Sequence, residues 1–167
     1  MRFKRGSTEF PLPSYTINGT PLNVVSCQRD LGVMVDSALK FHTHIREITN
    51  KANGVAANIL RSTVCRSATF MKKVFICHIR PLLDFSSVLW NTGYLCDLQL
   101  IEGVLRRWTR QISGFENVPY SDRLKELNLF SMKGRLLRSD LIKIWKILHG
   151  HSPKLEHLLV RSNIGST

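Results

Sequence analysis

The chain has 167 residues, of which 43% are hydrophobic and 22% are charged. This composition is typical of one folded domain and excludes a disordered chain. A net charge of +12 favours a polyanionic partner such as nucleic acid. No apolar run approaches the roughly 18 residues of a membrane span, so no membrane association is expected. Four cysteines without a CxxC pair, and no signal peptide, favour an intracellular protein, nuclear or cytoplasmic, with buried reduced thiols.

The first forty residues have the pattern of β structure. Asn18-Gly19 lies between two β-prone runs, residues 15–17 and 22–25, and this dipeptide is a strong hairpin signal because both residues tolerate positive φ. Residues 31–35 form a third β-rich run. The sequence therefore predicts an antiparallel three-strand piece within residues 1–36, and such a small sheet needs a partner surface.

After residue 36 the apolar residues follow a helical period. Residues spaced three and four apart predict a helix over about 41–61 whose apolar stripe is Ile45, Ile48, Ala52, Val55 and Ile59. Further helices are predicted over 68–90 with a kink near Pro81, along the stripe from Leu98 to Ile112 with Gly114 at its end, and over 121–127 and 132–149. The last of these carries Leu137, Leu141, Ile144 and Leu148 on one face.

The predicted fold class is therefore α+β, with segregated elements rather than alternating βαβ units. A small β piece (1–36) precedes a mostly α-helical bundle (37–150), and a loosely ordered tail follows (151–167). Trp90, Trp108 and Trp145 are expected in the core, because large apolar rings partition there more often than they serve as platforms for bases.

Catalytic and metal-binding signals are weak. No two acidic residues are adjacent, whereas two-metal polymerases and nucleases need clustered carboxylates, and Asp30 and Asp36 are better explained as strand-end residues. His42, His44, Cys77 and His78 lack the ligand spacing typical of structural zinc sites, and are expected to be surface histidines and buried cysteines. We expect no catalytic, cofactor-binding or metal-binding residue in this chain.

Basic residues give the strongest functional signal. Arg106, Arg107 and Arg110 fall opposite the stripe from Leu98 to Ile112, so they are expected to point away from the core. The last helix adds a second set of basic residues, Lys133, Arg135, Lys143 and Lys146. Clustered cations suffice to bind phosphates, so these seven residues are the predicted nucleic-acid contacts. The alternative is an ordinary solvated helix face.

Several motifs resemble one family in its order. They are Tyr15-Thr16-Ile17-Asn18-Gly19, Arg29-Asp30-Leu31-Gly32-Val33, Phe41-His42-Thr43-His44-Ile45, Lys51-Ala52-Asn53, Ile79-Arg80-Pro81-Leu82-Leu83-Asp84-Phe85, Val88-Leu89-Trp90-Asn91, Ile101-Glu102, Arg106-Arg107-Trp108-Thr109-Arg110-Gln111-Ile112-Ser113-Gly114, Tyr120, Arg123-Leu124 and Lys146-Ile147-Leu148-His149-Gly150. Over residues 15–150 the chain resembles the part of a non-LTR (LINE-type, Jockey-like) retrotransposon reverse transcriptase that follows its catalytic core.

The resemblance implies the end of a palm followed by a helical thumb, which grips an RNA or DNA duplex through its phosphate backbone. The paired aspartates that hold Mg²⁺ in the full-length RNA-directed DNA polymerase lie upstream of the matched region, so this chain is expected to be inactive alone. Two alternatives remain open: a non-enzymatic helical scaffold that docks a partner protein, and a decayed retrotransposon remnant without a selected function. The sequence leaves the oligomeric state and the choice between RNA and DNA open.

Overall fold

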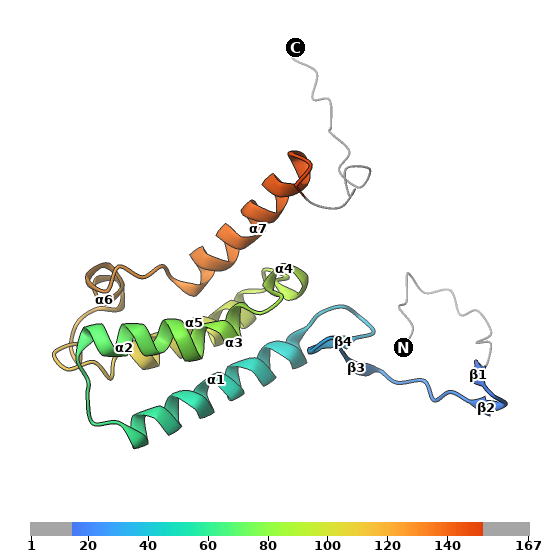
Figure 1. Cartoon of the computed structure of the whole chain (residues 1–167), viewed down its shortest axis with the longest axis horizontal. Coiled ribbons are helices and arrows are strands. Elements are labelled where there is room, and N and C mark those ends of the chain that lie inside the picture. The colour runs from blue at the N-terminus through green and yellow to red at the C-terminus, as the bar shows by residue number, and fades with distance from the viewer. Residues whose placement is uncertain (1–14, 152–167) are drawn as a thin grey trace, which may run out of the picture.

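A computed structural model describes residues 15–151 and has the expected α+β class, with small antiparallel β pieces followed by helices (Figure 1). The predicted tail lies outside the described residues, except for residue 151. No helix among the described residues is long and apolar enough to cross a membrane. The elements are β1 (Thr16–Ile17), β2 (Thr20–Pro21), β3 (Cys27–Asp30), β4 (Val33–Asp36), α1 (His42–Ser62), α2 (Ala68–Val74), the π-helix η1 (Phe75–Ile79), α3 (Arg80–Asp84), α4 (Ser87–Trp90), α5 (Leu95–Thr109), α6 (Tyr120–Glu126) and α7 (Met132–Leu148).

The first hairpin has the predicted turn but a shorter second strand. Asn18 (φ 49°) and Gly19 (φ 77°) form the turn between β1 and β2. The strand expected over residues 22–25 is absent, because pairing ends where the Leu22 N–H donates to the Tyr15 carbonyl at 2.8 Å. Every residue of β1 and β2 is exposed, so this hairpin packs against no core among residues 15–151.

The third predicted strand, residues 31–35, is correct only for residues 33–35, which belong to β4. Leu31 (φ 44°) and Gly32 (φ 89°) are turn residues, and β3 pairs with β4 on either side of them. Residues 15–151 therefore contain two separate two-stranded sheets instead of one three-stranded piece. Val33 of the second hairpin is buried and contributes to the main core. Of the two hairpins, only this one packs against the helices.

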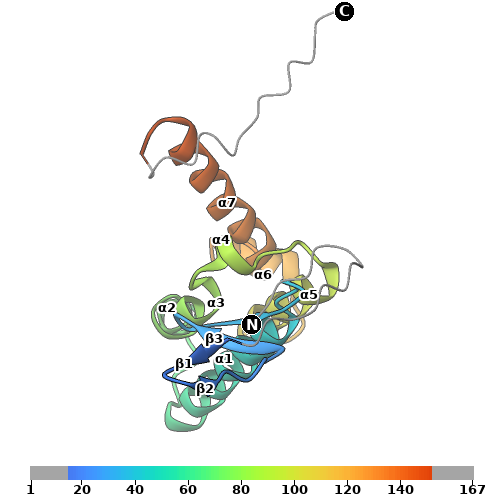
Figure 2. The same ribbon diagram turned by 90° about the vertical axis from the view of Figure 1, so that its right-hand side faces the viewer.

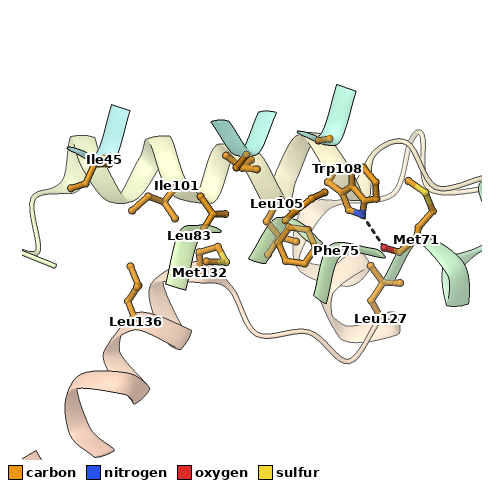
Figure 3. Packing of buried hydrophobic residues seen from close by; sticks show 14 of the residues in the cluster. Ile45, Met71, Phe75, Leu83, Ile101, Leu105, Trp108, Leu127, Met132 and Leu136 are labelled. Carbon is orange, nitrogen blue, oxygen red and sulfur yellow. Dashed lines mark hydrogen bonds between the residues drawn. The ribbon is translucent and has the colours of Figure 1, made fainter. Parts of the chain in front are cut away.

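The core lies mainly between α1, α5 and the segment from α2 to α3, as Figures 1 and 3 show. The predicted stripe on α1 is confirmed, because Ile45 and Ala52 are buried and the other three members are half-buried. The stripe on α5 is also confirmed. Its buried members are Ile101, Leu105 and Trp108, and Ile112 is buried just beyond the helix.

The helix predicted over residues 68–90 is divided into four pieces. Pro81 has no N–H to donate and its ring crowds the preceding turn, and the π-helix η1 lies directly before the short helix that contains it. Phe75 and Ile79 of η1 and Leu83 of α3 lie on one buried face. In an α-helix residues four apart drift by about 40°, and the wider turns of the π-helix offset this drift because residues four apart there fall short of a full turn. A second break follows at Ser86 (φ 53°), before α4.

The C-terminal part contains two departures from prediction. Helix α5 ends at Thr109, five residues before Gly114, whose φ of 86° belongs to the following turn. Helix α7 projects from the bundle (Figure 2), and among its residues only Met132 and Leu136 are buried. Trp145, predicted in the core, is 51% exposed, whereas Trp90 and Trp108 are buried as expected. Leu137, Leu141, Ile144 and Leu148 also stay exposed, because no element covers that face among residues 15–151.

Candidate nucleic-acid interface

Helix α5 presents an arginine face to solvent. Its opposite side carries the core residues described above, so the helical period fixes which residues point outward. Arg106, Arg107 and Arg110 are all exposed, as the sequence predicted. We refer to these three residues as the α5 arginine face.

The positive charges of the three guanidinium groups remain available to bind an anion. The Arg106 guanidinium lies over the Tyr120 ring, 4.9 Å from its centroid, and Arg107 donates a hydrogen bond of 3.0 Å to Oδ1 of Asn53 on α1. Neither partner is an anion. None of the α5 arginine face forms an ion pair with an acidic side chain in the described part of the chain. The surface therefore carries three positive charges that no carboxylate neutralises directly.

A fourth arginine lies beneath this face. Arg123 of α6 is only 6% exposed and donates to the Arg106 carbonyl at 3.1 Å and to Oγ1 of Thr109 at 3.0 Å. Burial, and then the positive charges of Arg110 and Arg106, lower its pKa. Its guanidinium joins α6 to the end of α5 and adds to the positive potential there. Residue-by-residue reasoning did not select it, although its position between Tyr120 and Leu127 places it on the inward side of α6.

Tyr120 and Glu102 fix the orientation of the elements around the arginine face. The Tyr120 hydroxyl donates to Oε1 of Glu102, and Oε2 of Glu102 accepts a 3.0 Å hydrogen bond from the Lys133 backbone N–H. Burial raises the pKa of Tyr120, and its hydrogen bond to Glu102 and the charge of that carboxylate raise it further. The hydroxyl therefore keeps its proton. One carboxylate thus connects α5 to both α6 and α7.

The predicted basic residues of α7 differ in their surroundings. Nε of Arg135 lies 2.5 Å from Oδ2 of Asp84, an oxygen that also lies 3.7 Å from Nε of Arg80. Arg135 therefore serves chiefly as a structural ion pair at the base of α7. Lys133 and Lys146 are exposed and Lys143 is half-buried. Lys143 and Lys146 lie in the second half of α7, beyond the buried residues Met132 and Leu136.

His44 and the cysteines depart from expectation, whereas His78 is exposed as predicted. His44 is buried, and its Nδ1 accepts a hydrogen bond of 3.2 Å from the Met34 N–H. Burial lowers the pKa of His44, with Arg29 acting in the same direction and Glu47 opposing both. Cys65, Cys77 and Cys96 are exposed and Cys27 is half-buried, so the expectation of buried thiols is wrong. Cys77 lies two residues from buried Phe75 and Ile79, and Cys96 lies two residues from Leu98, so helical period places both about half a turn from the core face.

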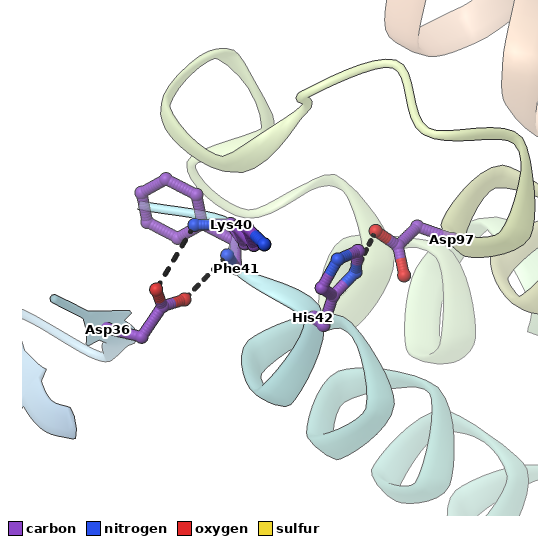
Figure 4. A network of polar contacts seen from close by, with 5 residues as sticks. All are labelled: Asp36, Lys40, Phe41, His42 and Asp97. Carbon is purple, nitrogen blue, oxygen red and sulfur yellow. Dashed lines mark hydrogen bonds and ion pairs between the residues drawn. The ribbon is translucent and has the colours of Figure 1, made fainter. Parts of the chain in front are cut away.

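Asp36 has the structural role that the sequence predicted. Its carboxylate accepts hydrogen bonds from the N–H groups of Ala38, Lys40 and Phe41 at 2.9, 3.2 and 2.8 Å. Partial burial acts to raise the pKa of Asp36, but these donors outweigh it and lower the pKa. The side chain holds the turn between β4 and α1 (Figure 4).

Comparison with known proteins gives one distant relative. The chain is 26% identical over 134 residues to "Uncharacterized protein B0403.1" of Caenorhabditis elegans, and the match covers 77% of this chain and 68% of that protein. No family model matches the chain, and no solved structure matches it.

Proposed function

We propose that the chain binds the phosphate backbone of an RNA or DNA duplex through the α5 arginine face. The observation that carries this proposal is the set of three exposed guanidinium groups, without acidic partners among residues 15–151, at the end of a core-packed helix. Arginine suits phosphate because its planar fork donates two parallel hydrogen bonds. Backbone contacts of this kind do not select sequence, so the binding is expected to be general.

The motif order described above supports a narrower form of the proposal. The chain would correspond to the thumb-like region of a retrotransposon reverse transcriptase, without a catalytic centre of its own. The absence of adjacent acidic residues within the 167 residues supports the second part. Purified chain is accordingly expected not to extend a primer with Mg²⁺ or Mn²⁺.

The test is a salt titration of duplex binding. Changing Arg106, Arg107 and Arg110 to Ala removes three phosphate donors. The loss of the Arg106–Tyr120 contact and of the exposed Arg107–Asn53 hydrogen bond should cost stability only about 1–2 kcal/mol. The slope of log affinity against log salt should fall in magnitude by about 2.7 for DNA, at about 0.9 per contact, and by a similar amount on two unrelated duplexes.

A matched control separates this surface from net charge. Arg46, Lys51 and Arg61 are three exposed basic residues on α1, so changing them to Ala removes the same formal charge elsewhere. The control should retain most of the salt slope. If the α5 variant folds and its slope is unchanged, or if both variants lose equally, the α5 arginine face is not the binding surface.

The exposed side of α7 supports a second candidate function, a helical scaffold for another protein. Leu141 and Ile144 are 57% and 46% exposed and lie within one continuous apolar face. Exposed apolar patches commonly mark interaction surfaces. A stable protein complex that forms without nucleic acid, and that is lost when both residues are changed to Gln, would favour this function over the first.

A further inference from the structure

The start of α1 and the start of α5 bring together three side chains of different metal-ligating types. His42 is the first residue of α1, and Cys96 and Asp97 lie in the first turn of α5. Their ligand atoms, an imidazole nitrogen, a thiol sulfur and a carboxylate oxygen, all lie within 4.8 Å of one another. Fifty-four residues separate His42 from Cys96, so ligand spacing along the sequence gave no indication of this group.

The carboxylate of this group is unusual because it is buried. Asp97 is only 4% exposed, and its Oδ2 lies 2.6 Å from Nδ1 of His42 (Figure 4). Burying a carboxylate requires a positively charged or hydrogen-bonding partner. His42 supplies one such partner, and it packs on the Tyr94 ring at 5.2 Å between centroids. Cys96 beside them is exposed, so an ion can reach the group from solvent.

The geometry points to a Zn²⁺ site formed by His42, Cys96 and Asp97. Zinc is bound in proteins by these three ligand types at about 2.0–2.3 Å, which puts tetrahedral ligand atoms roughly 3.3–3.8 Å apart. The present separations extend from 2.6 Å to at most 4.8 Å. Small side-chain rotations that move each ligand atom by about 1 Å would therefore allow the ion to bind.

The ligand set also selects the class of metal. A thiolate and an imidazole favour zinc and its neighbours in the transition series, whereas Mg²⁺ and Ca²⁺ prefer oxygen ligands. Three protein ligands leave a fourth position on the exposed side of Cys96 for water. Zinc binds cysteine as the thiolate and histidine as the neutral imidazole, so zinc affinity at such a site falls as the pH is lowered.

The site would connect two helix starts that are distant in sequence. Helices α1 and α5 pack side by side along the core, and the ion would join them at one end through His42 on one helix and Cys96 and Asp97 on the other. Such a link stabilises the folded chain by an amount that rises with the logarithm of the zinc concentration above the dissociation constant, because the unfolded chain does not hold these residues together. This role is independent of the nucleic-acid binding proposed above.

The experiment uses Co²⁺ as a spectroscopic substitute for Zn²⁺, with the full chain purified free of metal and kept reduced. One equivalent of Co²⁺ should produce the near-ultraviolet absorption of a cobalt–thiolate bond, and added Zn²⁺ should abolish it. Cys96→Ser should lose this band, and His42→Gln should weaken Co²⁺ affinity at least about tenfold. Cys77→Ser, which removes another exposed thiol beside a histidine, should retain both.

A second readout is thermal stability. Zinc should raise the melting midpoint of the wild-type chain and of Cys77→Ser, and should leave that of Cys96→Ser unchanged. The assignment is overturned if no saturable band forms, if the band survives Cys96→Ser, or if Cys77→Ser removes it. It is also overturned if zinc shifts the melting midpoint of Cys96→Ser as much as that of the wild type.

Discussion

The indole N–H of Trp108 on α5 donates a hydrogen bond of 3.0 Å to the backbone carbonyl of Met71 on α2 (Figure 3). Both residues are buried, and this bond connects two helices that are 37 residues apart in sequence. The Met71 carbonyl also accepts the Phe75 N–H, so it retains a partner when the indole is removed. Trp108 therefore contributes through both ring volume and a directional bond.

Trp108→Phe should destabilise the fold by about 2 kcal/mol, because it removes one hydrogen bond and leaves a void beside a smaller ring. The melting midpoint should fall by roughly 6 °C for a domain of this size. Trp145→Phe is the matched control, because Trp145 is half-exposed on α7 and should change stability by less than about 0.5 kcal/mol. Equal losses in the two variants would contradict this assignment of the core.

The two hairpins should differ in their contribution to stability. Compared with a chain that begins at residue 15, one that begins at residue 25 lacks only exposed β1 and β2 and should keep its melting midpoint. A chain that begins at residue 37 also loses buried Val33, the Met34–His44 hydrogen bond and the Asp36 contacts. It should lose cooperative melting or aggregate, because apolar surface on the helices becomes exposed. Identical melting of all three chains would show that neither hairpin supports the bundle.

His44 should make the fold sensitive to mild acid. Its pKa is lowered from the ordinary value of 6.5, chiefly by burial, so below pH 6.5 the unfolded chain binds this proton more readily than the folded chain. Stability is therefore complete above about pH 6.5 and declines as the pH falls toward the lowered folded pKa. His44→Asn keeps a short polar side chain without a titrating group and should flatten this part of the profile.

Melting curves between pH 5 and 8 measure the effect. His78→Asn is the control, since His78 is exposed on η1 and should leave the slope unchanged. A His44→Asn profile as steep as that of the wild type would assign the acid sensitivity to other groups.

The parts of the fold that could be predicted from the sequence depend on local rules. Asn18-Gly19 determines its turn by residue type, and the apolar stripes of α1 and α5 follow the helical period. The turn at Leu31-Gly32 was missed because leucine rarely adopts a positive φ, and here it does so at φ 44°. Here the pairing of β3 with β4 outweighs the preference of Leu31 for a negative φ.

The candidate sites also combine features that local rules predict with features that depend on packing between elements. Exposure of Arg106, Arg107 and Arg110 follows from helical period alone, but burial of Arg123 depends on how α6 packs against α5. The approach of His42 to Asp97 depends on how α5 packs against α1. The apolar pattern of α7 correctly predicted a helix, yet an apolar pattern cannot indicate whether a second surface is present to cover it.

The projection of α7 has a consequence for amide hydrogen exchange along that helix. Starting a helix is unfavourable, whereas extending one is nearly neutral, and the buried residues Met132 and Leu136 hold the first turns in place. The hydrogen bond of 2.7 Å from Asn91 to Asp140 extends this support to the middle of the helix. Beyond Asp140 the outer turns propagate from a nucleus that the bundle has already formed. Their backbone amides should therefore exchange progressively faster toward Leu148, although this segment keeps its helical shape.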